Sequence, residues 1–391
     1  SIPVTLMKQS APYKTVTRKL KSKPVQPAIS QVTKALKVIQ KANWPVIFAG
    51  SGVVRSGAEK ELAKFIKLTG IPLLTSLGGR GIMPEGKPLV IGSPSYTFDV
   101  SPLETSDLFI VLGTRLNPVN LRLGGVELPE RMVQVDSDTP NPKFKKAYVY
   151  IQSDIKEFLL RINKEIKTRK QYPKRPSSRI FTTLKKSYRD FTATAHSAIR
   201  AQPSKLSSQK FLLELSHYLE KSDATLFTDS IWIPYVHLLP RARKKRSFFS
   251  MRSYGCLGFA LPAALGACLA DRRKNVISLS GDGAFLFNCQ ELSTAATYGL
   301  TNFIQIILNN NGYSSLHDLA RAQFEKQGEY YLWKKIDYHR FSESLGVKAI
   351  TVASPRQISP ALKKALNGNG PYLINVITTD QDNLKGAFWT E

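Results

Sequence analysis

The sequence predicts an α/β protein with two doubly wound, mainly parallel-sheet domains joined by a linker. Short runs of residues that are apolar on both faces alternate along the chain with amphipathic helical patterns, which is typical of parallel sheets covered by helices. The alternation stops once, over a polar and basic stretch at residues 166–204, and then resumes. A chain of 391 residues with 42% hydrophobic residues has room for two such cores, and this composition excludes a globally disordered protein.

Residues 30–165 form the first, or central, predicted domain. An apolar stripe at residues 32–39 predicts a helix that ends before Pro45, and residues 58–68 predict a helix that stops at Gly70. Each predicted strand is a short apolar run, and the four runs are residues 46–49, 71–75, 108–112 and 132–135.

Residues 205–391 form the second predicted domain, and residues 166–204 form a connector with helical stretches. The predicted strands of the second domain are residues 225–227, 276–279, 303–308 and 372–377. Helical patterns lie between them at residues 259–270, 288–298, 338–345 and 355–367. Upstream of both domains, residues 8–29 are rich in Lys, Ser and Pro, a composition typical of an extended linker.

Two polar loops follow neighbouring strands of the second domain. Ser280-Gly281-Asp282-Gly283-Ala284 comes after one apolar strand, and Asn309-Asn310-Asn311-Gly312-Tyr313 comes after the next. In a doubly wound sheet the carboxyl ends of the strands face the ligand crevice. Two glycines in the first loop allow the backbone to approach an anion closely, and the turn leads toward a helix whose N–H groups favour phosphate.

Oxygen atoms from both loops suit a magnesium ion. Asp282 offers a carboxylate, Asn310 offers an amide oxygen, and the carbonyl of Gly312 could supply a third ligand. Mg²⁺ prefers such oxygens and is usually completed by the phosphates of a substrate or cofactor. Gly-Asp-Gly alone is often only a turn, but its combination with Asn-Asn after the following strand predicts a metal-bridged diphosphate site.

This combination resembles the thiamine-diphosphate-dependent enzymes of the acetolactate synthase, benzoylformate decarboxylase and benzaldehyde lyase type. The resemblance implies that Asp282, Asn310 and the Gly312 carbonyl hold Mg²⁺. It also implies that the turn at Gly281 brings the amides of Gly283 and Ala284 to the cofactor diphosphate. The implied reaction is decarboxylation or carboligation of a small 2-oxo acid or aldehyde, in a homo-oligomer.

The segment Tyr254–Ala264 resembles the part of this family that lies beside the pyrimidine ring of the cofactor. The resemblance implies that the Gly255 carbonyl accepts a hydrogen bond from the 4′-amino group and that Leu257 bends the cofactor into a V shape. Cys256, between them, is expected to be a small buried thiol.

The residues after the strand at 225–227 depart from the family pattern. The family often has Gly and then His or Gln at the positions of Ser230 and Trp232, where they grip the diphosphate. Ser230 is still predicted to donate to the diphosphate, whereas Trp232 is interpreted as a core or interface aromatic.

The central domain resembles the Rossmann-like middle domain of the same family. In some members that domain binds FAD or another nucleotide, and in others it binds nothing. Gly50-Ser51-Gly52 after the first strand therefore has two interpretations, a nucleotide contact or a tight strand-to-helix turn. Arg115, after a later strand, is likewise either a phosphate ligand or a solvated strand-end residue.

No catalytic residue can be assigned for the activating glutamate, because no glutamate in this chain matches the family motif. In the family that residue lies on a pyrimidine-binding domain of another subunit, and residues 2–5 look like the closing strand of that domain. Residues 1–29 are therefore interpreted as the end of an N-terminal domain plus a linker. Three hypotheses stay open: a fragment, an enzyme split over two polypeptides, or a non-catalytic homologue.

The charge balance is strongly basic, with 56 Lys and Arg against 29 Asp and Glu, a net charge of +27. The basic clusters at residues 18–24, 165–175 and 241–246 indicate either solvated faces or attraction of anions and polyanions. A nucleic-acid-binding module is disfavoured, because no zinc finger, RNA-recognition motif, heptad or homeodomain pattern is present.

The composition also indicates in which cellular compartment we expect the protein. Three cysteines are too few for a disulfide framework, and no apolar run reaches the ~18 residues of a membrane span. We expect a protein of the cytoplasm or an organelle matrix, without a membrane partner.

Overall fold

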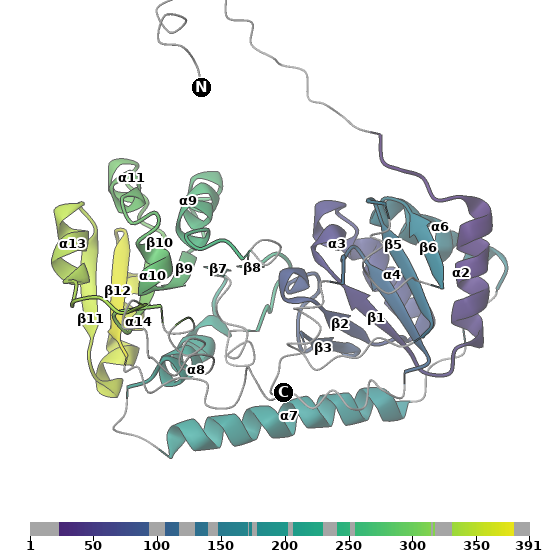
Figure 1. Ribbon diagram of the computed structural model, residues 1–391, viewed down its shortest axis with the longest axis horizontal. Coiled ribbons are helices and arrows are strands. Elements are labelled where there is room, and N and C mark those ends of the chain that lie inside the picture. Colours follow the sequence, from purple (N-terminus) through teal and green to yellow (C-terminus); the bar gives the residue numbers. More distant parts are fainter. Residues whose placement is uncertain are drawn as a thin grey trace, which may run out of the picture.

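The computed structural model contains two six-stranded sheets in which every strand pair is parallel (Figure 1). Helices flank both sheets, which confirms the predicted α/β class. The residues that the structure describes are 23–93, 106–116, 130–139, 148–170, 172–173, 178–201, 206–229, 241–250, 255–313, 316 and 331–378.

The central sheet has the strand order β3-β2-β1-β4-β5-β6. Its strands are β1 Pro45–Ala49, β2 Leu73–Thr75, β3 Val90–Gly92, β4 Leu108–Leu112, β5 Met132–Asp136 and β6 Val149–Gln152. The chain moves outward from β1 in one direction and then returns to β4 on the other side, so the sheet has a switch point between β1 and β4. The four predicted strands are confirmed, and β3 and β6 were not predicted.

Helices cover the central sheet on the face that carries its larger core. They are α2 Ile29–Lys41, α3 Ser51–Arg55, α4 Glu59–Thr69 and α6 Ile155–Thr168. Buried residues of α2, α4 and α6 form one cluster with β1 and β4. Asp154 begins α6, because its side chain accepts from the N–H groups of Lys156 and Glu157.

The second sheet has the order β11-β12-β10-β9-β7-β8. Its strands are β7 Thr225–Thr228, β8 Phe248–Ser250, β9 Val276–Gly281, β10 Phe303–Asn309, β11 Lys348–Val352 and β12 Tyr372–Ile377. The chain passes from β7 to the edge strand β8 and then returns to β9 on the other side of β7. The switch point of this sheet therefore lies between β7 and β9. The strands β8 and β11 were not predicted.

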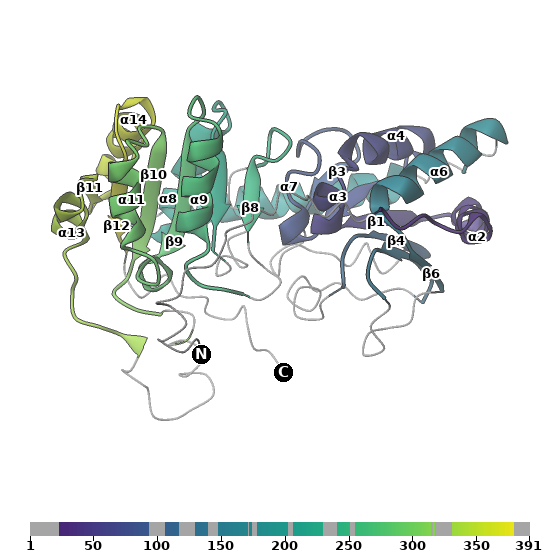
Figure 2. The same ribbon diagram turned by 90° about the horizontal axis from the view of Figure 1, so that it is seen from above.

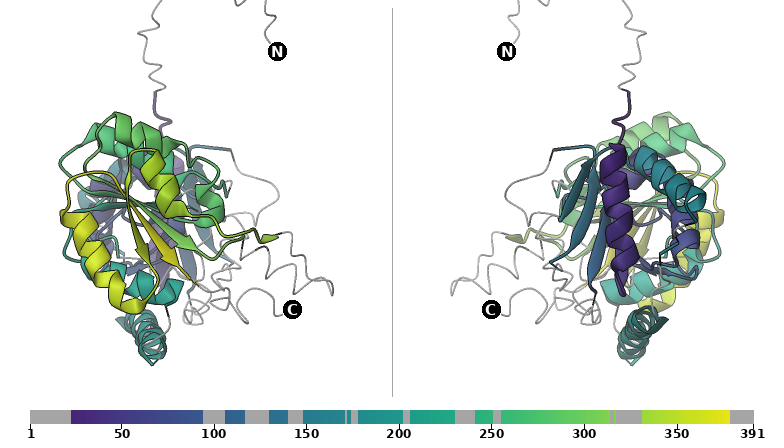
Figure 3. Two further views of the ribbon diagram at one scale, coloured as in Figure 1. Left: turned by 90° about the vertical axis from the view of Figure 1, so that its left-hand side faces the viewer. Right: turned by 90° about the vertical axis from the view of Figure 1, so that its right-hand side faces the viewer.

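Helices pack on both faces of the second sheet (Figure 3). One face carries α8 Ser208–Leu219 and α14 Ile358–Asn367, which follows the short 3-10 turn Pro355–Gln357. The other face carries α9 Ala260–Ala270, α11 Glu291–Thr297 and α13 Tyr338–Ser344. The single turn α10 Asp282–Phe285 lies between β9 and α11.

The predicted connector contains one long helix, α7 Ser178–Arg200, of 23 residues. It runs beneath both sheets (Figures 1 and 2). Near its start, Phe181 packs against the second face of the central sheet, and near its end Ile199 packs against the core of the second domain. The connector thus includes a long helix that makes an apolar contact with each domain. No helix in the described part of the chain is long and apolar enough to cross a membrane.

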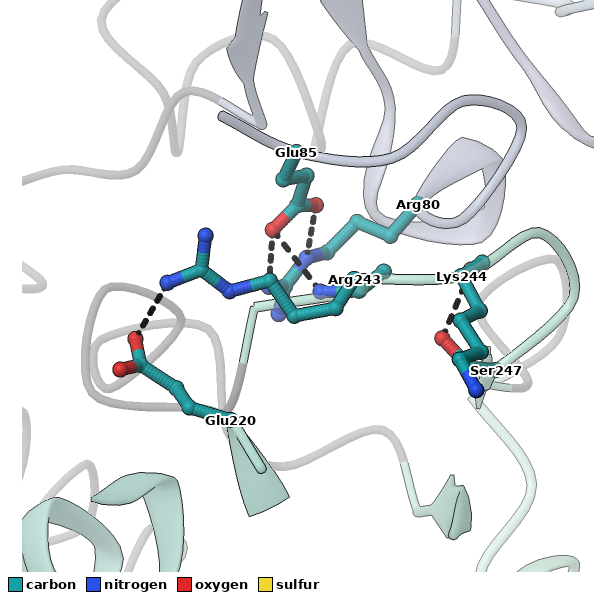
Figure 4. A network of polar contacts seen from close by, with 7 residues as sticks. Arg80, Glu85, Glu220, Arg243, Lys244 and Ser247 are labelled. Atoms are coloured by element: carbon teal, nitrogen blue, oxygen red, sulfur yellow. Dashed lines mark hydrogen bonds and ion pairs between the residues drawn. The ribbon is translucent and has the colours of Figure 1, made fainter. Parts of the chain in front are cut away.

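A buried ion pair lies where the two domains meet (Figure 4). Arg80 donates through Nε and Nη2 to the two carboxylate oxygens of Glu85, each at 2.8 Å, and the two side chains are only 2% and 7% exposed. Both residues belong to the central domain. The Glu85 carboxylate also accepts from the N–H of Ala242 at 3.2 Å, and the Arg80 guanidinium lies 4.3 Å from the ring centroid of Phe248. The ion pair therefore joins the central domain to β8 and the segment before it.

The basic run at residues 241–246 belongs to this junction. Arg246 donates to Glu59 of the central domain at 2.7 Å, Arg243 donates to Glu220 at 2.8 Å, and Lys244 pairs with Asp223. The backbone N–H of Arg246 also donates to the carbonyl of Gly81. Three cations of the run are thus paired within the chain, so it is neither a purely solvated face nor a free polyanion site.

We expect Glu85→Ala to lower the free energy of unfolding by about 3–5 kcal/mol, because it leaves the buried Arg80 guanidinium without its carboxylate. Denaturant unfolding followed by circular dichroism measures the change. Glu220→Ala is the matched control: its pair with Arg243 is more than a third exposed and is worth about 1 kcal/mol or less. Equal effects of the two substitutions would show that the Arg80–Glu85 pair does not hold the junction.

Candidate functional site

The candidate site lies at the switch point of the second sheet. Ligands of doubly wound proteins bind outside the carboxyl ends of the strands at this place, where loops leave in opposite directions. The register pairs Gly281 of β9 with Leu308 of β10, so the loops after these strands begin at the same level. The two motifs singled out from the sequence are thereby brought together, as predicted.

Asp282 is the centre of the site and is 1% exposed. Its Oδ2 accepts from the backbone N–H of Gly312 at 3.1 Å, which joins the loop after β9 to the loop after β10. Burial raises the pKa of Asp282 to about 7, and the backbone N–H groups of Gly312, Gly283 and Asn311 limit this rise. A cation beside this carboxylate would favour its ionised form.

The loop after β10 is fixed by amide side chains. Asn309 accepts through Oδ1 from the N–H of Asn311 at 3.1 Å and donates through Nδ2 to Asn375 of β12 at 3.1 Å. Asn311 has a left-handed backbone with φ 57°, which asparagine tolerates better than most residues. Asn310 lies between these two anchored residues and is half-buried. Its position is thus set by the backbone of the loop.

Three glycines of the two loops differ in what surrounds them. A Cβ on Gly283 would lie 2.4 Å from the ring of Tyr313, and one on Gly312 would lie 2.6 Å from the carbonyl oxygen of Tyr331. No heavy atom lies within 4 Å of a Cβ placed on Gly281. Space for a ligand at the first loop is therefore on the side of Gly281, whereas Gly283 and Gly312 are required by packing.

The donor set fits a magnesium ion that is completed by phosphate oxygens. No group of three or more His, Cys, Asp or Glu in the described residues could hold a metal by itself. Of the two loops, the first contributes the buried carboxylate of Asp282, and the second contributes the amide oxygen of Asn310 and the carbonyl of Gly312. Hard oxygen donors in such small number suit Mg²⁺, which commonly retains waters and phosphate oxygens as ligands. In the structure, backbone N–H groups, among them that of Gly312, point at the Asp282 carboxylate.

The segment before α9 has two left-handed glycines, Gly255 with φ 64° and Gly258 with φ 79°. A Cβ on Gly258 would lie 2.7 Å from Asn288, and Asn288 donates through Nδ2 to the Gly258 carbonyl at 2.7 Å. Leu257 is half-buried in this turn. The prediction that Cys256 is buried is wrong, because it is exposed in the turn between the glycines.

A second buried carboxylate, Asp229, follows β7 directly and is 1% exposed. Its Oδ1 accepts from the N–H of Ala260 at 3.0 Å, so it holds the first turn of α9. Burial raises the pKa of Asp229 to about 6, and the N–H groups at the start of α9 limit this rise. Asp229 had no predicted role. A carboxylate directly after an apolar strand at the switch point was the signal that could have found it.

Other predicted positions are outside the described residues or have an explanation within the fold. Ser230, Trp232 and residues 2–5 are outside the described residues. In the central domain, a Cβ on Gly50 would lie 2.5 Å from the Gly113 carbonyl oxygen, and Gly52 approaches Gly113 as closely. The tight turn thus accounts for these glycines. Arg115 donates to Asp138 at 2.6 Å in an exposed pair, and FAD or another nucleotide in this domain stays a prediction.

Comparison with protein-family models gives two matches. Residues 32–162 match the central domain of thiamine pyrophosphate enzymes, and residues 233–376 match the C-terminal TPP binding domain of thiamine pyrophosphate enzymes. Thiamine pyrophosphate is the same compound as thiamine diphosphate. The second match includes the Asp282 loop, the Asn310 loop and the segment before α9.

The chain is also similar to acetolactate synthases over most of its length. The probable acetolactate synthase large subunit of Methanocaldococcus jannaschii is 30% identical over 374 residues, which cover 89% of this chain and 59% of that protein. The acetolactate synthase large subunit of Corynebacterium glutamicum is 32% identical over 376 residues, covering 90% and 57%. The chloroplastic acetolactate synthase 3 of Brassica napus is 27% identical over 379 residues, covering 92% and 56%.

The chain spans a little under three-fifths of the length of these curated relatives. The two matched domains coincide with the two sheets of the structure, and the cofactor-binding match lies on the sheet that carries Asp282. The chain therefore belongs to the thiamine pyrophosphate enzyme family.

Proposed function

We propose that the chain is part of a thiamine-diphosphate- and Mg²⁺-dependent enzyme that decarboxylates or ligates small 2-oxo acids, as an acetolactate synthase does. The observation that carries this proposal is the buried Asp282 carboxylate, joined to the loop after β10 by the Gly312 amide at 3.1 Å. The names of the similar proteins support the substrate class.

The proposed roles follow from the position of each residue. Asp282, the Asn310 side chain and the Gly312 carbonyl would hold the metal. The diphosphate would lie on the open side of Gly281, within reach of the amides of Gly283 and Ala284. When bound, thiamine diphosphate supplies a nucleophilic thiazolium carbon and an electron sink for the 2-oxo acid.

The segment before α9 orients the other half of the cofactor. The Gly255 carbonyl would accept a hydrogen bond from the 4′-amino group, and the half-buried Leu257 would support the bent form of the cofactor. Asp229 is a positioning residue, because its carboxylate fixes the start of α9 and so the place of Leu257. Ser230, which follows Asp229, stays a predicted donor to the diphosphate.

A pyrimidine-binding domain completes the proposed site. The carboxylic acid that activates the cofactor comes from that domain, either in a preceding segment of the same protein or in a second polypeptide. The assembled enzyme is proposed to be a homo-oligomer in which this domain faces the Asp282 edge of the second sheet.

Thiamine diphosphate with Mg²⁺ is expected to raise the melting temperature of the chain, and Asp282→Ala is expected to abolish this shift. At a ligand concentration of about 100 Kd the stabilisation is about 2.7 kcal/mol, which differential scanning fluorimetry detects. Asp271→Ala is the matched control, since this half-buried aspartate lies at the other end of β9 and pairs with Arg273. A shift that survives in Asp282→Ala would refute the proposed metal site.

We expect no decarboxylation of 2-oxo acids by the 391-residue chain alone, even with thiamine diphosphate and Mg²⁺, because no glutamate in it matches the activating position. Release of CO₂ measured at saturating cofactor checks this. Turnover that the purified chain sustains, and that Asp282→Ala loses, would show that the activating acid lies in this chain after all.

The buried Asp229 makes stability depend on pH. Its pKa is 3.8 when unperturbed and about 6 in the fold, so between these values the folded chain keeps a proton that the unfolded chain loses. The free energy of unfolding therefore falls as pH rises from about 4 to about 6, by at most about 3 kcal/mol from this group. Asp229→Asn removes this contribution, so the variant is expected to gain stability relative to the parent between pH 4.5 and 7.

Denaturant unfolding of both proteins at these two pH values measures the difference. Other titrating groups, including Asp282, are common to the parent and the variant and cancel. Parallel stability profiles for the two proteins would show that Asp229 is ionised at its ordinary pKa in the fold.

A further inference from the structure

A layer of buried polar side chains lies in the second sheet, just before the Asp282 and Asn310 loops. The strands β9, β10 and β12 lie side by side there (Figure 1). A parallel strand that is buried on both faces usually carries apolar side chains, so this layer requires an explanation. Its members are Ser280 of β9, Gln305 and Asn309 of β10 and Asn375 of β12, and none is more than 5% exposed.

Gln305 joins β10 to β9. Its Nε2 donates to Oγ of Ser280 at 2.9 Å and to the backbone carbonyl of Ile306 at 2.9 Å. Ser280 carries the last side chain of β9 before Asp282, because Gly281 has none. The hydrogen bond from Gln305 therefore holds β9 just before the Asp282 loop begins.

Asn309 joins β10 to β12 in a similar way. Its Nδ2 donates to Oδ1 of Asn375 at 3.1 Å, and Asn310 follows it directly. Between the two loops, the backbone N–H of Gly312 donates to Asp282 at 3.1 Å. The two side-chain hydrogen bonds therefore fix three strands relative to one another, immediately before the proposed metal ligands.

The stability of the sheet does not account for Gln305. Its Oε1 and the hydroxyl of Ser278, its register partner on β9, have no hydrogen-bond partner within the described part of the chain. Burying such atoms costs free energy, and replacing both partners of a buried hydrogen bond by apolar groups of similar shape is often neutral or stabilising. What the hydrogen bond to Ser280 adds is a fixed distance and direction between the ends of β9 and β10.

The ion that the proposed site accepts depends on this distance. The proposed ligands come from two loops, with Asp282 after β9 and with Asn310 and Gly312 after β10. Mg²⁺ demands a nearly ideal octahedron of oxygens at about 2.0–2.1 Å, whereas Ca²⁺ accepts irregular shells at about 2.3–2.6 Å. A small separation of the two loops therefore weakens Mg²⁺ binding more than Ca²⁺ binding.

We propose that Gln305 is a positioning residue, which fixes Ser280 and thereby sets Asp282 relative to Asn310 and Gly312, so that the site favours Mg²⁺ over Ca²⁺. Gln305 acts through Ser280 and is not itself a ligand. The metal preference rests on the proposed function, whereas the effect of Gln305 on the two loops does not.

Calorimetric titration with Mg²⁺ and with Ca²⁺, each in the presence of thiamine diphosphate, tests the metal preference. The variant is Gln305→Leu/Ser280→Ala, which removes both partners of the hydrogen bond and so leaves neither of them unpaired. We expect its Kd for Mg²⁺ to rise at least about fivefold and its Kd for Ca²⁺ to change less than about twofold. Its melting temperature is expected to equal or exceed that of the parent, a combination that a merely structural role would not give.

Asn302→Leu is the matched control, because Asn302 is a buried amide that joins the opposite ends of the same two strands. Its Nδ2 donates to the backbone carbonyls of Asp271 at 3.2 Å and of Lys274 at 2.7 Å, and the residue is 7% exposed. We expect this variant to have a lower melting temperature but to keep both Kd values within about twofold of the parent, below its melting transition. Equal rises of the two Kd values in the double variant, or the same change of preference in Asn302→Leu, would overturn the proposed metal preference.

Amide hydrogen exchange of Gly312 tests the positioning role without any ligand, since this N–H donates to Asp282. We expect it to exchange at least about fivefold faster in Gln305→Leu/Ser280→Ala than in the parent, while amides in the middle of β10 keep their protection. Unchanged exchange at Gly312 would overturn the positioning role, whatever the chain binds. A parent chain that binds neither thiamine diphosphate nor Mg²⁺ would overturn the proposed function and the metal preference, whereas faster exchange at Gly312 would still support the role of Gln305 in holding the loops.

Discussion

The parallel register of β9 between β7 and β10 is the constraint on which the site depends. It brings the carboxyl ends of three strands to one edge, where Asp229 and Asp282 are both 1% exposed. A buried carboxylate is costly unless backbone N–H groups point at it, and here the start of α9 and the loop after β10 supply them. Each carboxylate therefore fixes the loop that donates to it, and these two loops carry the residues proposed to orient the cofactor.

The two sheets show how one architecture supports different chemistry. Both have a switch point, but in the central sheet the loops at Gly50 and Gly113 pack backbone against backbone, with no room for a Cβ. In the second sheet, no heavy atom lies within 4 Å of a Cβ placed on Gly281. A glycine in a turn after a strand is thus required either by close packing or by the approach of a ligand. The atoms that a Cβ on that glycine would contact distinguish these two reasons.

Much of the fold followed from the sequence, because buried parallel strands such as β4 are short continuous apolar runs that alternate with amphipathic helical patterns. The missed strands have weaker patterns: β3 and β8 have three residues each, and β11 is half-exposed at the sheet edge. The proximity of Asp282 to Gly312 was predictable, since both follow neighbouring strands. The exposure of Cys256 was not, because nothing in the local pattern separates a buried thiol from one in the turn between the left-handed residues Gly255 and Gly258.

The structure shows two different environments for the excess basic residues, which the sequence does not distinguish. In the run at residues 241–246, cations meet Glu59, Glu220 and Asp223, which are distant in sequence or on other elements, so no local pattern could reveal the pairing. On α7, Lys185 lies over the ring of Phe181, and Arg189 pairs with the neighbouring Asp190 in an exposed contact of 3.5 Å. Glu85 belongs to the first case, because it is buried with Arg80 and also accepts from the N–H of Ala242, so one carboxylate holds charge and backbone from both domains.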